Sequence, residues 1–134
     1  MIVIDASALV KLLLKEEGWE EVVDQLRLGA LSLDLAVKEA ANAICFRLKL
    51  RGLSLKDASE LFKALKTLAG KAIKVEREEA YLDEAVEIAL KHGVTVYDAL
   101  YIALAKSNGL KLLTADKEQA KIAELEKVPV ILLS

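Results

Sequence analysis

Residue types that indicate disulfide, zinc or membrane chemistry are scarce in this chain of 134 residues. Cysteine and histidine occur once each, so the chain has neither an internal disulfide nor the paired thiolate and imidazole ligands of a zinc site. We expect Cys45 to belong to the core, His92 to end a helix, and the protein to work in the reducing cytoplasm. No stretch free of Asp, Glu, Lys and Arg exceeds seven residues, whereas a membrane-spanning helix needs about 20 apolar ones. We therefore expect no transmembrane segment and no signal peptide.

Charge of one sign, aromatic side chains and glycine motifs are scarce as well. The net charge is -2 at pH 7, with 19 basic and 21 acidic residues. This argues against a protein that coats nucleic acid but permits a nuclease that reaches phosphate through a metal ion. One Trp, three Tyr and two Phe are too few and too dispersed for a platform that stacks RNA bases. No G-x-G pair and no G-x-x-x-x-G-K-[ST] loop occurs, which excludes the common nucleotide-binding motifs.

Short apolar runs alternate with amphipathic segments along the whole chain. Strands are predicted near residues 2–4, 31–33, 72–75, 110–114 and 128–133, and helices near residues 7–15, 19–28, 34–51, 55–69, 78–92, 98–108 and 116–126. The connections are short, and no linker or repeat divides the chain. This pattern predicts one domain, residues 1–134, of the α/β class, with three layers (α/β/α) around a mostly parallel sheet of about five strands. Pro129 suits an edge strand.

The first predicted strand, residues 2–4, is apolar on both faces, which is typical of a central parallel strand. It runs directly into Asp5, and a carboxylate at the end of a buried strand is costly unless something pairs with it. Ser7 is predicted to cap the helix that follows, as Asp34 and the Ser54-x-x-Asp57 pattern cap later helices. In open α/β sheets, ligands bind at the carboxyl ends of the strands, so Asp5 marks the predicted site.

Three further acids share the unusual setting of Asp5, and the four together are called the acid quartet below. Glu39 lies inside a helix on a stretch that otherwise resembles core, Asp98 precedes seven uncharged residues, and Asp116 follows the strand that ends at Thr114. Helix capping is an equal alternative for Asp98 and for Asp116 taken singly, but it fails for Glu39. Strand ends and the helix starts that follow them meet at one edge of a parallel sheet. The acid quartet is therefore predicted to converge.

Carboxylates that converge repel one another and raise one another's pKa, so they require a cation. Ligands made of oxygen alone favour Mg²⁺ or Mn²⁺ over zinc. Such a site is suited to phosphoryl transfer, because the ion polarises a phosphate oxygen, lowers the pKa of a bound water and offsets the repulsion between substrate and acids. The sequence therefore predicts a metal-dependent enzyme that acts on phosphate esters.

These residues, in this order, resemble the PIN domain and, within it, the VapC-type toxins of prokaryotic toxin–antitoxin pairs. The resemblance rests on four stretches: Ile2-Val3-Ile4-Asp5-Ala6-Ser7, Glu39 with Asn42, Tyr97-Asp98-Ala99-Leu100-Tyr101, and Leu113-Thr114-Ala115-Asp116. It covers essentially the whole chain in length and in strand–helix order. One departure is Gln119-Ala120, where relatives often place a bulky aromatic residue.

The resemblance implies an endoribonuclease that uses Mg²⁺ or Mn²⁺ and water to cut RNA phosphodiester bonds. The acid quartet would hold the metal and orient the attacking water. Ser7 and Thr114 match hydroxyl positions that support the quartet, and Asn42 matches a polar neighbour of the second acid. The resemblance also implies a homodimer and a cognate VapB-type antitoxin whose peptide covers the active site. The leucine-rich stretches 9–14 and 55–68 suit such interfaces, although core packing is the favoured explanation for most of these leucines.

Several alternatives stay open. Arg47 and Arg51, on the helix of Glu39, are candidates for contacts with RNA phosphates, and a solvated helix end is the slightly favoured alternative. A phosphatase of the haloacid dehalogenase type needs a second Asp two positions after Asp5, where Ser7 stands, and a receiver domain needs paired acids after its first strand. A housekeeping RNA-processing PIN nuclease and a PIN-like interaction module without catalysis both remain possible.

Overall fold

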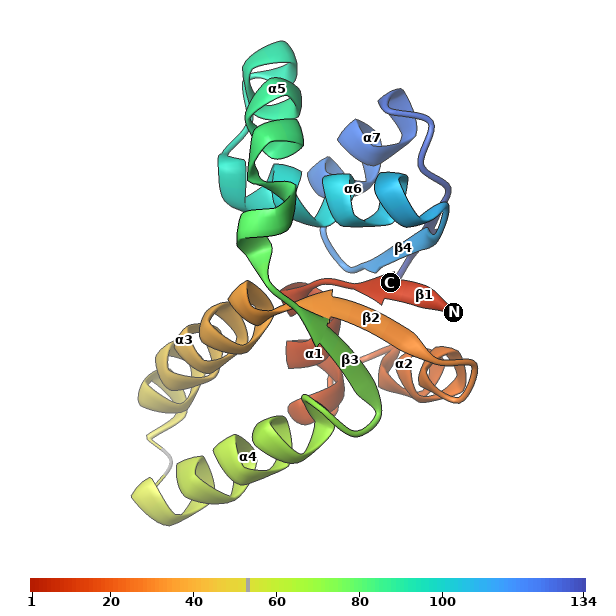
Figure 1. Ribbon diagram of the computed structural model, residues 1–134. Coiled ribbons are helices and arrows are strands. Elements are labelled where there is room, and N and C mark those ends of the chain that lie inside the picture. The colour runs from red at the N-terminus through yellow and green to blue at the C-terminus, as the bar shows by residue number, and fades with distance from the viewer. Residues whose placement is uncertain (53) are drawn as a thin grey trace.

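Five strands form one sheet in the computed structural model, which describes residues 1–52 and 54–134. They are β1 (Ile2–Ile4), β2 (Ala30–Leu33), β3 (Ile73–Glu76), β4 (Lys111–Thr114) and β5 (Val130–Leu132). Their order is β3-β2-β1-β4-β5, and every neighbouring pair is parallel. The predicted five-stranded α/β sheet is confirmed, with β1 at its centre and β5, which follows Pro129, at one edge (Figure 1).

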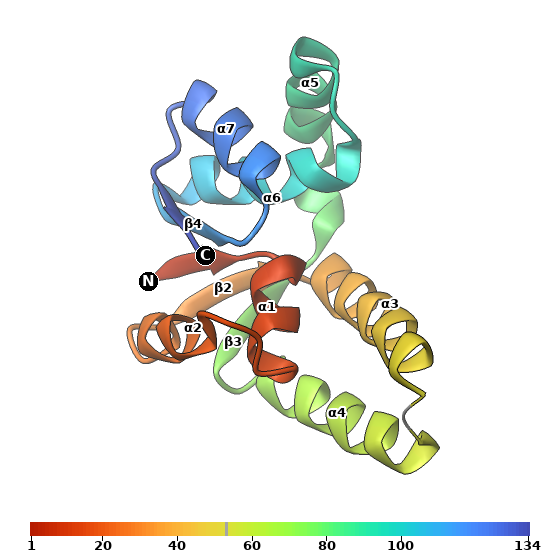
Figure 2. The same ribbon diagram turned by 180° about the vertical axis from the view of Figure 1, so that it is seen from behind.

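Helices cover both faces of the sheet. The chain first proceeds from β1 through β2 to β3. The helices of this part cover one face of the sheet (Figure 1): α1 (Ala6–Leu13), α2 (Trp19–Leu26), α3 (Asp34–Arg51) and α4 (Leu55–Leu68). The chain then crosses back to β4, which pairs with the edge of β1 that faces away from β2. Because crossovers between parallel strands are right-handed, this reversal places η1 (Glu78–Tyr81), α5 (Leu82–His92), α6 (Val96–Asn108) and α7 (Lys117–Leu125) on the opposite face (Figures 1 and 2).

The core lies between β1 and the helices on either side of it. All three residues of β1 are buried, and each such side chain stabilises the fold by roughly 1.5–3 kcal/mol. In α6, seven consecutive residues from Ala99 to Ala105 are buried, and the small alanines allow the helix to lie close to its neighbours. No single helix among the described residues is long and apolar enough to cross a membrane. Within the same residues, one pair of helices, Glu78–His92 and Val96–Asn108, reaches the necessary length and composition when the two are taken together, but the pair is bent by 118°.

Three local predictions were wrong or incomplete. The N-cap of α1 is Asp5, whose side chain accepts the amide of Ala8, while Ser7 lies inside the helix. Asp34 is the first residue of α3 rather than its cap, and its carboxylate accepts the backbone amide of Glu78, 44 residues away, at 3.0 Å. Cys45 is exposed rather than buried, because it lies on the exposed face of α3 with Asn42 and Lys49. Ser54, by contrast, caps α4 as predicted.

A charged cluster around Glu126 joins the helices on the α5–α7 face. His92 is the last residue of α5, as predicted, and its Nε2 lies 2.6 Å from Oε2 of Glu126, while Lys106 donates to Oε1 at 2.9 Å. The Glu126 side chain is only 5% exposed, and Lys91 approaches it at 3.3 Å. The hydrogen bonds from His92 and Lys106 hold the pKa of Glu126 at about 2, below its ordinary value of 4.5.

We expect Glu126→Gln to lower the free energy of unfolding by about 2 kcal/mol near pH 7, because hydrogen bonds to a charged group are replaced by weaker ones. Since the folded pKa (about 2) lies below the ordinary 4.5, this contribution is present above pH 4.5 and is lost as the pH falls toward 2. Denaturant unfolding across that range measures it. Glu124→Gln, an exposed change on the same helix, is the control. A pH-independent difference would contradict the prediction.

Candidate active site

The acid quartet lines one pocket at the carboxyl edge of the sheet. The pocket has a volume of about 160 Å³ and is lined by Asp5, Ala6, Ser7, Glu39, Asp98, Tyr101, Asp116 and Gln119. No lysine or arginine lines it, and within the described chain no carboxylate of the quartet takes part in an ion pair. The four negative side chains predicted to converge therefore share one small space without a protein cation.

Each acid reaches the pocket from a different element. Asp5 ends β1 and Asp116 follows β4, and these two strands are neighbours at the point where the strand order reverses. Glu39 comes from the second turn of α3, and Asp98 from the first turn of α6, on the other face of the sheet. The reversal brings both helix layers to the same strand ends, which is where ligands bind in open α/β sheets.

Asp5 is the most tightly held carboxylate of the quartet. It is 4% exposed. Its Oδ1 accepts hydrogen bonds from the Ser7 hydroxyl at 2.6 Å and the Ala8 amide at 3.0 Å, and its Oδ2 accepts one from the Thr114 hydroxyl. Both oxygens are thus used by the fold, and all three donors are neutral.

The two hydroxyl groups around Asp5 also fix the turn that carries Asp116. Ser7 Oγ accepts the amide of Ala115 at 2.9 Å, and Thr114 Oγ1 accepts the amide of Asp116 at 3.0 Å. Ser7 and Thr114 were predicted to support the quartet, and these contacts give them a way to do so. They connect the end of β1 to the end of β4.

The other three acids keep oxygen atoms available. Glu39 Oε1 accepts the Tyr101 hydroxyl at 2.6 Å. Asp116 is the N-cap of α7, and its Oδ1 accepts the amides of Glu118 at 2.9 Å and Gln119 at 3.1 Å. In the described chain, the second oxygen of each has no hydrogen-bond partner, and the Asp98 carboxylate is paired with the Thr95 side chain. The pocket therefore presents at least three free carboxylate oxygens.

Burial makes ionisation of three acids of the quartet unfavourable. It raises the pKa of Asp5 from 3.8 to about 6 despite the hydrogen bonds from Ser7 and Thr114, and the charge of Asp116 adds to the rise. Burial, with the charges of neighbouring acids, also raises the pKa of Glu39 and of Asp98. A bound cation would favour the ionised form of these carboxylates and so offset the effect of burial.

Two pocket residues were missed by the sequence analysis. Tyr101 is 2% exposed and follows Asp98 by three residues, so the helical spacing of the two was a signal that could have placed it on the same face of α6. Gln119, 4% exposed, donates through Nε2 to the backbone oxygen of Asp98 at 2.9 Å and so joins α7 to α6. Its Oε1 is the one buried side-chain oxygen in residues 1–52 and 54–134 without a partner.

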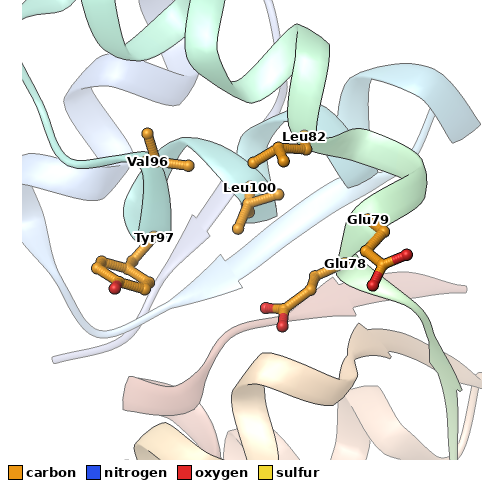
Figure 3. Close-up of a pocket in the computed structure, with 6 residues that line it drawn as sticks. All are labelled: Glu78, Glu79, Leu82, Val96, Tyr97 and Leu100. Atoms are coloured by element: carbon orange, nitrogen blue, oxygen red, sulfur yellow. The ribbon is translucent and has the colours of Figure 1, made fainter.

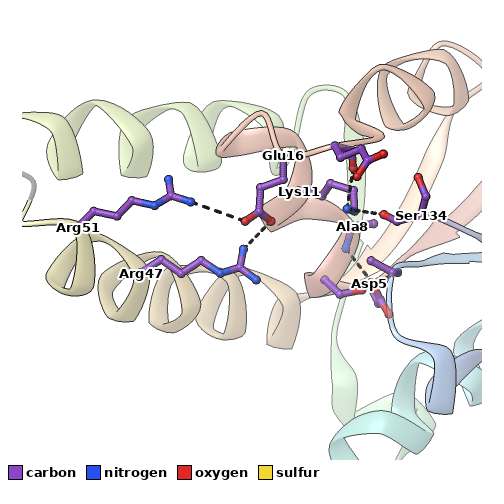
Figure 4. A network of polar contacts seen from close by, with 10 residues as sticks. Asp5, Ala8, Lys11, Glu16, Arg47, Arg51 and Ser134 are labelled. Carbon is purple, nitrogen blue, oxygen red and sulfur yellow. Dashed lines mark hydrogen bonds and ion pairs between the residues drawn. The ribbon is translucent and has the colours of Figure 1, made fainter.

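Three predicted residues lie elsewhere. Asn42 is exposed on α3 and does not line the pocket. Arg47 and Arg51 lie about 12 and 18 Å beyond Glu39 along the helix axis, and both point to Glu16, at 2.7 and 3.9 Å (Figure 4). In that position they join α3 to the turn after α1. Contact of either arginine with RNA stays a prediction.

A larger pocket, of about 460 Å³, lies between η1, α5 and α6. Leu82, Val96 and Leu100 form its apolar wall, and Tyr97, the residue before Asp98, lies at its side with Glu78 and Glu79 (Figure 3). Its two carboxylates come from an exposed or half-buried turn. The smaller pocket, where four carboxylates meet, is therefore the better candidate for the active site.

The acid quartet fits a hard divalent cation. Only oxygen donors surround the pocket, with no histidine or cysteine among its lining residues, and such donors suit Mg²⁺ or Mn²⁺. Among the described residues no three of these side chains stand close enough to form a complete metal-binding cluster. Mg²⁺ is commonly held by one or two carboxylates, with water and substrate phosphate as its other ligands, so a complete protein cluster is not required.

Comparison with known proteins agrees with this fold. Residues 2–125 match the family model of the PIN domain, and the chain therefore belongs to the PIN domain family. Within that family it is of the VapC type. It is 42% identical over 134 residues to Ribonuclease VapC3 of Pyrobaculum aerophilum, covering 97% of this chain and 96% of the relative. It is 36% identical over 115 residues to Exonuclease VapC9 of the same organism, covering 86% and 80%.

Solved structures show the same architecture. The crystal structure of PAE2754 from Pyrobaculum aerophilum matches with a TM-score of 0.73 and 30% identity, over 96% of this chain and 81% of that one. FitAcB from Neisseria gonorrhoeae matches with a TM-score of 0.65 and 22% identity, over 98% and 96%. At that identity the second match supports the fold alone.

We expect the metal-free native protein to lose up to about 3 kcal/mol of stability between pH 4 and pH 8 through ionisation of Asp5, and Asp5→Asn to lack this loss. The folded pKa of Asp5, about 6, lies above the ordinary 3.8, so the ionised carboxyl costs stability that returns as the pH falls through 6 to below 4. Unfolding in EDTA between pH 4 and pH 8 measures this pH dependence, which is separate from the constant cost of replacing an oxygen that accepts a hydrogen bond. Asp83→Asn, an exposed change on α5, should keep the native pH dependence. The same pH dependence in Asp5→Asn and in the native chain would contradict the prediction.

Proposed function

We propose that this protein is a metal-dependent endoribonuclease and the toxin of a VapBC-type toxin–antitoxin pair. The observation that carries the proposal is the convergence of four carboxylates from four elements on one pocket that no lysine or arginine lines. Carboxylates that share one space repel one another, so their presence together is best explained by a bound cation and by the phosphate chemistry that it supports. The similarity to Ribonuclease VapC3 supports the same reaction class.

Each residue of the site has a distinct task in this proposal. Glu39, Asp98 and Asp116 offer their free oxygens to Mg²⁺ or Mn²⁺, which when bound would polarise a phosphate oxygen and favour deprotonation of water. Asp5, with both oxygens engaged, holds the ends of β1 and β4 together and would add negative charge to a metal site. Asp98 lines the pocket and is available to orient the attacking water. Water adds to phosphorus, and the bond to the leaving oxygen breaks.

The mode of cleavage is the finer part of the proposal. One relative is called a ribonuclease and the other an exonuclease, so the two names differ on whether a free end is required. The pocket lies at an open sheet edge, and internal cleavage needs only that an extended strand can pass over it. We therefore propose that the protein cleaves single-stranded RNA at internal positions.

Partner binding follows from the apolar surfaces that the fold leaves uncovered. A groove of about 590 Å³ between α1 and α4 is lined in part by Leu12, Leu13, Leu61 and Leu68. Its leucines are half-buried rather than fully packed, which supports a peptide of a VapB-type antitoxin as the occupant. A homodimer is part of the proposal as well. A housekeeping RNA-processing nuclease would have the same active site without the antitoxin.

The decisive experiment uses a circular single-stranded RNA, which has no ends. We expect the native protein to linearise it with Mg²⁺ or Mn²⁺ and not in EDTA. Asp98→Asn should lower the rate at least about 100-fold, since one positioned carboxylate is lost. Asp83→Asn is the matched control, because Asp83 lies in the first turn of α5 as Asp98 does in α6 but is exposed and outside the pocket.

The outcomes separate the alternatives. Cleavage that survives both EDTA and Asp98→Asn would contradict the metal mechanism. Cleavage of linear RNA but not of circular RNA would indicate an exonuclease instead. A native protein that binds neither Mg²⁺ nor Mn²⁺ in a calorimetric titration would favour an interaction module without catalysis.

A further inference from the structure

Tyr101 engages one of the two oxygens of Glu39. Its ring is 2% exposed on α6, and its hydroxyl donates to Oε1 of Glu39 on α3 at 2.6 Å. Tyr101 lines the pocket together with Glu39. In the described chain, Oε2 of Glu39 has no hydrogen-bond partner. Glu39 can therefore offer the pocket one oxygen, while the other is held by a buried side chain.

Asp116 is limited in a similar way. Its Oδ1 accepts two backbone amides at the start of α7, those of Glu118 and Gln119, and its Oδ2 is left for the pocket. Asp5 has donors on both oxygens. The Asp98 carboxylate is paired with the Thr95 side chain. The pocket is thus built from carboxylates that mostly present a single oxygen.

The number of free oxygens distinguishes hard cations. Ca²⁺ takes six to eight oxygen ligands and commonly uses both oxygens of a carboxylate, whereas Mg²⁺ is smaller, requires octahedral geometry and keeps several waters. A pocket of single free oxygens supplies too few ligands for Ca²⁺ but enough for the smaller ion. The Asp116 bonds come from the backbone and cannot be removed by substitution, but the Tyr101 bond can.

We propose that Tyr101 makes the site selective, by restricting Glu39 to one free oxygen and so disfavouring Ca²⁺ relative to Mg²⁺ and Mn²⁺. This rests on the proposed function, because it requires that the pocket bind a divalent cation. Tyr101 acts through Glu39 and is a positioning residue rather than a catalytic one. It lies outside the acid quartet and contributes no carboxylate.

The chain contains a matched control. Tyr81 donates its hydroxyl to Oε1 of Glu76 at 2.7 Å, which is the same kind of tyrosine–glutamate bond as that between Tyr101 and Glu39. Neither Tyr81 nor Glu76 lines the acid pocket. Tyr101→Phe and Tyr81→Phe each remove one hydroxyl and keep the ring, so they differ in whether the released carboxylate belongs to the pocket.

The test is calorimetric titration of the native protein and both variants with Mn²⁺ and, separately, with Ca²⁺. The native protein and Tyr81→Phe should bind Mn²⁺ at least about tenfold more tightly than Ca²⁺. In Tyr101→Phe this ratio should fall about tenfold, in keeping with the effect of residues that orient metal ligands. Thermal unfolding without metal checks that each variant is folded.

Three results would overturn the proposal. An unchanged ratio in Tyr101→Phe, including an equal loss of affinity for both ions, would show that the hydroxyl only supports the structure. Equal affinity of the native protein for Mn²⁺ and Ca²⁺ would overturn the proposal even if Tyr101→Phe did not fold, because the site would then have no selectivity to explain. A native protein that binds neither ion would remove the proposed function as well, which separates that failure from the other two.

Discussion

The structure depends on a carboxylate that is buried at the end of its central strand. Asp5 ends β1, is 4% exposed, and is held by the hydroxyls of Ser7 and Thr114 and the amide of Ala8. Because the donors are neutral, the fold satisfies the hydrogen bonds of this group without neutralising its charge. The same contacts start α1, hold β4 beside β1 and fix the turn before Asp116. One costly residue thus organises the local fold and gives the pocket its negative charge.

The topology explains why the other acids meet Asp5. The strand order reverses between β1 and β4, so helices from both faces reach the same edge of the sheet. Glu39 comes from the α1–α4 face and Asp98 from the α5–α7 face. The buried, alanine-rich body of α6 allows it to lie close to the sheet and brings Asp98 near the strand ends. The site therefore results from the reversal of strand order between β1 and β4 rather than from any one segment.

The acids divide into those that the fold uses and those that it leaves available. Asp5 has both oxygens engaged, whereas Glu39, Asp116 and Asp98 each have one hydrogen-bonded oxygen among the described residues. This gradation follows from position, since a group buried at a strand end needs donors to be tolerated, whereas a group at a pocket rim can rely on water. The number of carboxylate oxygens that the fold leaves free also underlies the proposal that Tyr101 makes the site selective among metal ions.

The sequence by itself determined the five-stranded parallel sheet, the central place of β1, the edge position after Pro129 and the convergence of the acid quartet. These follow from local periodicity and from the rule that parallel strands end at one edge. Only the tertiary structure showed that Tyr101 and Gln119 line the pocket, that Glu16 pairs with Arg47, and that Cys45 is exposed. Such features depend on which side chains from distant segments meet, and this is fixed by packing between elements rather than by the pattern within one.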